Sequence, residues 1–192
     1  MALLVEPHVH QWTRSEYYKM AEAGLFDGKH VELIEGQVIE MSPMGSRHRT
    51  AVTLSGDALR QVFRQGHFVR IQGPLDFGEL SEPEPDIAVI AGHVRDYPEA
   101  HSTTAVLLVE VAETSLNDDR TVKASLYAKV GIAEYWILNL IDRQLEVHRT
   151  PITDPTQPHG FGYADVTRYA ATEVVTPLAL PQVTMAVADL LL

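Results

Sequence analysis

Three charged residues stand out in this sequence, because the position of each suggests either a partner of opposite charge or a role in chemistry. Glu110 interrupts Ala105–Ala112, a run of apolar and β-branched residues that predicts a strand covered on both faces. A carboxylate buried there costs several kcal/mol, on the order of the effective burial penalty of one ion, unless a cation or hydrogen-bond donors surround it. Glu110 therefore belongs to a buried ion pair, lies at a strand end that reaches solvent, or acts as a metal ligand or general base.

Asp86 is the second of these residues. It follows Pro83-Glu84-Pro85 and opens the predicted strand Ile87–Ile90, so by itself it is consistent with an ordinary strand entry. Two carboxylates at corresponding points of neighbouring strands can hold Mg²⁺, because this ion prefers oxygen ligands in octahedral geometry. The sequence leaves open whether the strands of Asp86 and Glu110 are neighbours.

Lys123 is the third residue, and the chain has only four lysines. It lies in a predicted helix that is capped within Asn117–Asp119 and runs to Val130. Tyr127 follows it by four positions, so both side chains project from one face of that helix. Lys123 is either a solvated helix residue or the cationic partner of the two carboxylates.

Weaker candidates come from the first part of the chain. Glu32 and Glu35 lie in a predicted hairpin, where they are exposed turn residues or ligands, and His48 lies near the start of the next predicted helix. The histidines show no metalloprotease spacing, and no P-loop, nucleophile-elbow or dinucleotide-binding glycine motif occurs. The absence of cysteine excludes thiolate catalysis and zinc–thiolate sites, and it predicts a cytoplasmic location.

The charge balance is strongly acidic, with a formal net charge of −11 from 15 basic and 26 acidic residues. Such a chain should not bind nucleic acid unspecifically, because counterion release requires clustered Lys and Arg. Residues 44–72 are a local exception, with five arginines against one aspartate. Arg60 and Arg64 share one helix face. This face is either solvated or in contact with phosphates, so a nucleic-acid partner remains open.

These residues need a scaffold, and the order of predicted elements supplies one. The 192 residues fit a single domain, with residues 1–11 as a flexible arm. No apolar run is long enough to span a membrane. Helices flanking a mixed central sheet, behind an N-terminal helix and hairpin, give an α/β fold. The predicted helices cover 13–24, 45–66 and 117–130, and the predicted strands lie within 31–41, 68–71, 87–90, 105–112, 134–140, 145–149 and the tail from 163, with a loop over 151–162.

Several strings in this order resemble the Uma-type family of putative restriction endonucleases, in the PD-(D/E)XK nuclease superfamily. The resemblance runs from about residue 12 to the C-terminus. Its strings are Glu32-Leu-Ile-Glu-Gly36, Met41-Ser-Pro43 with His48, Pro85-Asp86-Ile87-Ala88-Val89, Glu110-Val111, and Lys123 to Tyr127 followed by Gly131-Ile-Ala-Glu-Tyr-Trp136.

The resemblance implies a restriction-endonuclease-like core in which Asp86, Glu110 and the carbonyl of Val111 bind Mg²⁺, or Mn²⁺ in its place. It further implies that Lys123 orients a water molecule or stabilises the phosphorus centre, and that Glu32 or Glu35 lines the same cleft. The superfamily lysine should follow Glu110 by two positions, where this chain has Ala112. Lys123 matches a lysine that has moved to the next helix.

We therefore expect a Mg²⁺-dependent endonuclease that acts on DNA. A homodimer would suit cleavage of both strands, with Tyr135, Trp136 or the hairpin as its contact. The alternatives are a catalytically silent binding or interaction module on the same fold, and a different phosphoryl or carboxylate enzyme with the same metal site. The expected nucleic-acid contacts are His48, Arg47, Arg60, Arg64 and Tyr127.

Overall fold

The computed structural model describes residues 8–192, in two compact units. The smaller unit contains the chain up to Pro43 together with Phe77–Pro83, and the larger contains Met44–Asp76 together with Glu84–Leu192. The predicted N-terminal arm falls largely outside the described residues, and the single domain stays a prediction. In the described part of the chain, no helix combines the length and apolar composition that crossing a membrane requires.

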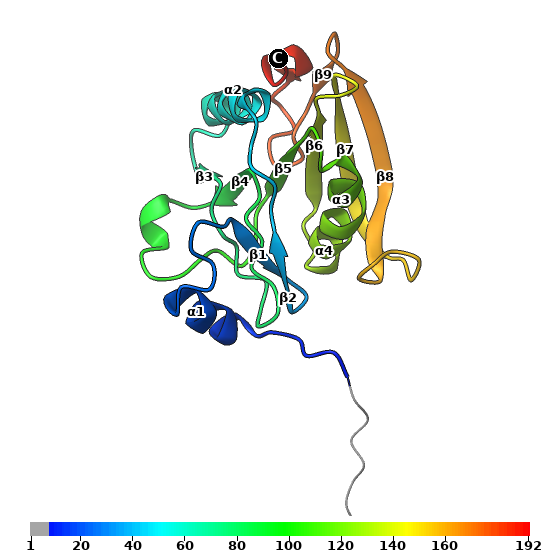
Figure 1. Ribbon diagram of the computed structural model, residues 1–192. Coiled ribbons are helices and arrows are strands. Elements are labelled where there is room, and N and C mark those ends of the chain that lie inside the picture. The colour runs from blue at the N-terminus through cyan, green and yellow to red at the C-terminus, as the bar shows by residue number, and fades with distance from the viewer. Residues whose placement is uncertain (1–7) are drawn as a thin grey trace, which may run out of the picture. The chain divides into compact units, whose positions relative to one another are not determined.

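The smaller unit consists of one helix and one hairpin (Figure 1). The helix α1 (Arg14–Glu22) begins at a capping box, in which the Thr13 side chain and Glu16 satisfy each other's backbone N–H groups. Strands β1 (Val31–Ile34) and β2 (Gln37–Glu40) pair antiparallel around a tight turn. Glu35 and Gly36 form that turn with positive φ angles of 48° and 75°. Both elements follow the sequence prediction.

The larger unit is built on a six-stranded sheet, in which the strands lie in chain order from β3 to β8. The β5–β6 pair is parallel and the other neighbours are antiparallel, so the sheet is mixed and the predicted α/β fold class is confirmed. The strands are β3 (His67–Ile71), β4 (Ile87–Ala91), β5 (Leu107–Ala112), β6 (Glu134–Asn139), β7 (Gln144–Thr153) and β8 (Phe161–Ala170), with a separate two-stranded pair of β9 (Val174–Val175) and β10 (Met185–Ala186).

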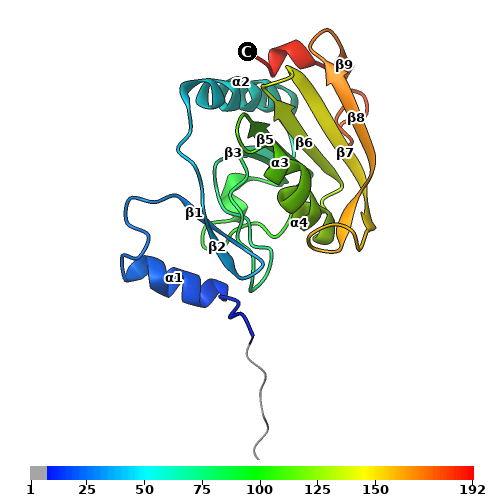
Figure 2. The same ribbon diagram turned by 45° about the vertical axis from the view of Figure 1, so that its right-hand side comes forward.

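Helices cover both faces of this sheet. On one face, α2 (Ser46–Val62) and the C-terminal segment bury a core of strand residues that includes Val109 and Trp136. The Ser55 hydroxyl joins α2 to this segment by donating to the carbonyl of Leu190, and Figure 2 shows the C-terminal end beside α2. On the opposite face lie α3 (Leu116–Asp118), the π turn η2 (Asp119–Lys123) and α4 (Ala124–Lys129). Two short 3₁₀ turns, η1 (Val94–Asp96) and η3 (Val187–Asp189), complete the unit.

Two predictions about the elements of this unit were wrong in part. The helix predicted to be capped within Asn117–Asp119 instead follows Ser115 and contains the π turn η2. The predicted loop over 151–162 is partly strand, because β7 continues to Thr153 and pairs there with β8. Pro151 is tolerated there because β6 pairs with β7 only as far as Arg149, so the missing N–H has no strand to bond on that side.

The predicted dimer contact through Tyr135 and Trp136 also fails. Both side chains have 0% exposed surface, since β6 is covered on both faces of the sheet. Neither residue can therefore contact a second copy of the folded chain.

Candidate active site

The register of β4 and β5 brings the two carboxylates together. Ile87 pairs with Val109 in the antiparallel ladder, so Asp86, one residue before β4, comes opposite Glu110. Directly opposed residues project from the same face of a sheet. This is the face that carries α3, the π turn and α4. Asp86 is 8% and Glu110 is 3% exposed, so both carboxylates are buried.

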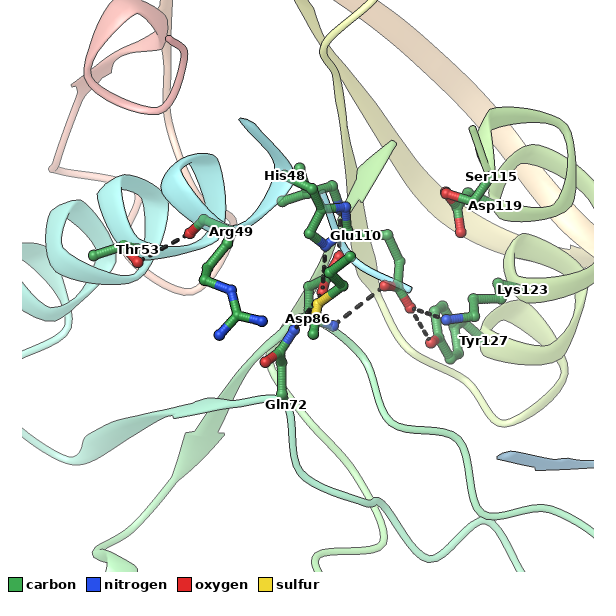
Figure 3. A network of polar contacts seen from close by, with 12 residues as sticks. His48, Arg49, Thr53, Gln72, Asp86, Glu110, Ser115, Asp119, Lys123 and Tyr127 are labelled. Carbon is green, nitrogen blue, oxygen red and sulfur yellow. Dashed lines mark hydrogen bonds and ion pairs between the residues drawn. The ribbon is translucent and has the colours of Figure 1, made fainter. Parts of the chain in front are cut away.

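Backbone groups of each strand bind the carboxylate of the other (Figure 3). The Asp86 N–H donates to Oε2 of Glu110 over 3.2 Å, and the Val111 N–H donates to Oδ2 of Asp86 over 2.9 Å. These reciprocal bonds hold both side chains at the end of the β4–β5 ladder. They supply part of the polar environment that a buried carboxylate requires.

Two side chains from the helix bind the second oxygen of Glu110. Lys123 donates from Nζ to Oε1 over 3.0 Å, and the Tyr127 hydroxyl donates to the same atom over 2.6 Å. Lys123 is 6% exposed and Tyr127 is fully buried. Lys123 is thus the cationic partner of Glu110. Tyr127 has no surface left for a nucleic acid to contact, so we reassign it from a nucleic-acid contact to a hydrogen-bond donor for Glu110.

Two side chains from the other side of the site bind Oδ1 of Asp86. His48, in the first turn of α2, lies 3.0 Å away through Nε2, and Gln72, just after β3, donates from Nε2 over 3.2 Å. Burial alone would raise the pKa of the Asp86 carboxyl, but the His48 contact, the Val111 N–H and the Lys123 charge together lower it below its usual value. Asp86 is therefore ionised at neutral pH.

The same contact changes the pKa of His48. Burial by itself would lower the pKa of the imidazole, but the bond to Asp86 and the charges of Asp86, Asp119 and Glu113 outweigh it and raise the pKa. The site thus combines an ionised Asp86 with an imidazole of increased basicity, beside the ion pair of Glu110 and Lys123.

Comparison with known proteins assigns this arrangement to a family. A family model described as Uma2, putative restriction endonuclease, matches residues 14–188. The chain belongs to the Uma2 family. Among solved structures, it is similar to a crystal structure of a putative nuclease belonging to DUF820 from Anabaena variabilis ATCC 29413, with a TM-score of 0.70 and 16% sequence identity. That match covers 93% of this chain and 96% of the other, and at this identity it shows a shared nuclease fold. No curated protein matches.

The other residues singled out in this Uma2 chain have contacts of their own. Glu32 is buried in β1 and Glu35 accepts a hydrogen bond from the Ser81 hydroxyl over 3.2 Å, both within the smaller unit. Arg47 lies 3.4 Å from Glu113, and Arg60 lies 3.0 Å from Asp57. Arg64 donates to the carbonyl of Gln61 over 2.8 Å. None of these three arginines contacts Asp86 or Glu110.

Two residues of the site were missed by sequence reasoning. Gln72 lies in the irregular stretch after β3, where nothing in the pattern marks an amide side chain as functional. Arg49 was counted only in the basic balance of residues 44–72. Its guanidinium is exposed and forms no hydrogen bond or ion pair with any described residue, and Figure 3 draws it on the side of Gln72 and Asp86. Its position directly after His48 on the first turn of α2 was the available signal.

A divalent metal is the group that a restriction-endonuclease-type family implies, and the donor set fits one only in part. The described residues contain no group of three or more His, Asp or Glu that could hold a metal ion. Two carboxylates at one register position, with Asp86 ionised, are nevertheless hard oxygen ligands of the kind Mg²⁺ takes, and this ion commonly keeps several waters. For Val111, the contact seen is its N–H on Asp86, and the carbonyl stays a predicted ligand.

Proposed function

We propose that this Uma2 chain is a Mg²⁺-dependent endonuclease that hydrolyses phosphodiester bonds in DNA. The observation that carries the proposal is the convergence of Asp86, Glu110 and Lys123 from two neighbouring strands and a helix. Asp86 and Glu110, with the carbonyl of Val111, would hold the ion, and Mn²⁺ would substitute for Mg²⁺. When bound, the ion lowers the pKa of water and offsets negative charge on a phosphate.

The protein's own groups would bind and orient the reactants. Hydrolysis forms one bond between a water oxygen and phosphorus, breaks one phosphorus–oxygen ester bond, and leaves a proton on the departing oxygen. Lys123 places its ammonium 3.0 Å from Glu110 Oε1 and would orient the water or stabilise charge on the phosphate. Tyr127 and the Asp86 N–H fix Glu110, while His48 and Gln72 fix Asp86.

Plasmid cleavage tests the proposal directly. The purified chain should nick or linearise plasmid in Mg²⁺ or Mn²⁺, should be inactive in EDTA, and should lose activity as Asp86→Ala. Asp57→Ala is the matched control, since Asp57 is an exposed aspartate on α2 whose side chain pairs with Arg60. Equal cleavage by Asp86→Ala and the unchanged chain would mean that the activity comes from a contaminant or from another site.

A catalytically silent binding module on the same fold is the second candidate. It is favoured by Ala112 at the position of the superfamily lysine and by the net charge of −11. Calorimetric titration with Mn²⁺ separates the two candidates. A silent module that has lost its metal should give no heat of binding, whereas the nuclease should bind Mn²⁺ and lose that binding as Glu110→Ala.

We also propose a homodimer and a cytoplasmic location for this nuclease. A dimer would present two sites, one for each strand of a duplex. The hairpin β1–β2 remains as the contact surface predicted from the sequence. Light scattering on the purified chain measures the mass directly, and a mass of one chain at all concentrations would exclude the dimer.

A further inference from the structure

Gln72 holds a backbone conformation that its side chain does not favour. Its φ angle is +46°, directly after the end of β3 at Ile71. Residues with a Cβ avoid this left-handed region, which glycine enters readily and asparagine tolerates. Such strain persists where the surrounding contacts impose it, and it is concentrated at functional sites. Gly73 directly follows in the sequence, yet the left-handed position falls on Gln72.

The contacts of Gln72 show what the conformation achieves. Its backbone N–H donates to the carbonyl of Asp86 over 3.0 Å, and its side-chain amide donates to Oδ1 of the same residue over 3.2 Å. The amide also contacts the sulfur of Met44, just before α2. Gln72 therefore binds Asp86 through both its main chain and its side chain, and Figure 3 shows the amide pointing at that carboxylate.

The two carboxylate oxygens of Asp86 differ in the number of hydrogen bonds that they accept. Oδ1 receives donors from both His48 and Gln72, which matches the two lone pairs of a carboxylate oxygen. Oδ2 accepts the N–H of Val111 and no other group among the described residues. The oxygen beside the backbone of β5 is thus the one with remaining capacity for a cation.

We propose that Gln72 is a positioning residue, which together with His48 fixes Oδ1 of Asp86 so that Oδ2 faces the metal. This inference rests on the proposed function, since it assigns Gln72 a part in holding the metal ligand. A purely structural role makes the opposite prediction. If only the backbone turn mattered, glycine would serve better at +46° and would keep the N–H bond to the Asp86 carbonyl.

Gln72→Gly separates the two roles. The change relieves the backbone strain and removes only the side chain. We expect the melting temperature of the metal-free chain to stay unchanged or rise, while calorimetry shows Mn²⁺ binding weaker by about 10- to 100-fold, the usual effect of removing a group that orients a metal ligand. Arg143→Gly is the matched control, because Arg143 also has a positive φ, of 51°, and lies exposed in the turn between β6 and β7. It should leave Mn²⁺ affinity unchanged.

Two further variants keep the test decisive. Gln72→Asn retains an amide and suits the left-handed conformation, but its side chain is one methylene too short to reach Asp86, so it should also bind Mn²⁺ more weakly if Gln72→Gly fails to fold. Asp86→Ala should abolish binding. Unchanged Mn²⁺ affinity in the folded Gln72 variants, with binding lost in Asp86→Ala, would overturn the role of Gln72 and leave the proposed function intact. No Mn²⁺ binding by the unchanged chain would overturn both.

Discussion

At the scale of single residues, the site is a pair of buried carboxylates whose four oxygens are held in different ways. The backbone of the opposite strand binds one oxygen of each carboxylate, and side chains outside the sheet bind the other. Two like charges at neighbouring positions repel each other in a weakly screening interior. The His48 contact, the Val111 N–H and the Lys123 charge offset that repulsion, so that Asp86 stays ionised. A divalent cation would be stabilised at the same place by the same charges.

Arg49 is the residue for which we predict contact with the substrate. Its exposed guanidinium has no partner among the described residues, whereas Arg60 on the same helix pairs with Asp57. Arg49→Ala should weaken binding of a short DNA duplex, and should reduce the slope of log K against log salt by about 0.9, the effect of one lost phosphate contact. Fluorescence anisotropy over a series of salt concentrations measures both quantities.

Arg60→Ala is the control for Arg49, because it removes an equal charge from the same helix. It should change the affinity and the salt slope far less. Identical curves for the Arg49 variant and the unchanged chain would show that the phosphate lies elsewhere.

At the scale of elements, the lysine that pairs with Glu110 is carried by the helical segment and not by strand β5. Glu110 and Ala112 lie on the same face of β5, and Ala112 has 0% exposed surface. Lys123 reaches the same carboxylate from the last position of the π turn η2. Such turns are rare and occur frequently at functional sites. Because only the place of the ammonium matters to its charge, the element that carries it is free to change.

Placing a lysine on β5 in place of Lys123 tests this argument. Lys123→Ala should lower kcat by about 10²- to 10³-fold, the loss expected when one charge-stabilising donor is removed from a site. Adding Ala112→Lys to that variant should recover part of the loss, since the truncated helix side chain makes room on the face of β5. Cleavage rates of the single and double variants, each checked for folding by circular dichroism, measure the recovery. A folded double variant as slow as Lys123→Ala would show that the two positions are not equivalent.

The sequence predicted those parts of the fold that follow from side-chain periodicity. The capping box of α1, the hairpin turn at Glu35-Gly36 and the buried strand around Glu110 are local patterns, and all three are present. The strand beyond Pro151 was missed because proline usually ends a strand, and only the end of the β6 pairing explains the exception. Gln72 was missed because neither its φ angle nor its distance from Asp86 leaves a trace in composition or spacing.

At the scale of the whole molecule, the net charge of −11 and the proposed nucleic-acid substrate make opposing demands. Binding to DNA requires local positive charge, and this chain concentrates arginines in residues 44–72. One of them, Arg49, directly follows the site residue His48 in the sequence. The remaining acidic surface repels phosphates. For the proposed DNA substrate, such a distribution would limit unspecific binding and would confine attraction to the segment that contains α2.

The stability of the larger unit should depend on pH through His148. This side chain is 6% exposed, forms ring contacts with Tyr135 and Tyr163 at centroid distances of 5.4 Å and 5.8 Å, and has no hydrogen-bond partner for Nε2 among the described residues. Burial lowers the pKa of the imidazole to about 4, against the attraction of Glu146. The folded chain therefore keeps His148 neutral at a pH where the unfolded chain protonates it.

The sign of the pH effect follows from that difference. The unfolded histidine takes up its proton near pH 6.5 and the folded one near pH 4, so the free energy of unfolding should be unaffected by His148 above that window and fall as the pH decreases through it. The loss is on the order of a few kcal/mol, at about 1.4 kcal/mol for each pKa unit. The raised pKa of His48 has the opposite effect on the free energy of unfolding. The stabilisation from His48 is present below pH 6.5 and is lost as the pH rises.

Urea unfolding at pH 7.5, 6 and 5 measures the contribution of His148. His148→Phe keeps an aromatic ring between Tyr135 and Tyr163 but cannot be protonated, so its free energy of unfolding should fall less between pH 7.5 and 5 than that of the unchanged chain. The carboxylates with lowered pKa, Asp86 and Glu146, lose their stabilising effect only at lower pH and are common to both proteins. Parallel curves for His148→Phe and the unchanged chain would mean that the buried imidazole accepts its proton in the folded state without cost.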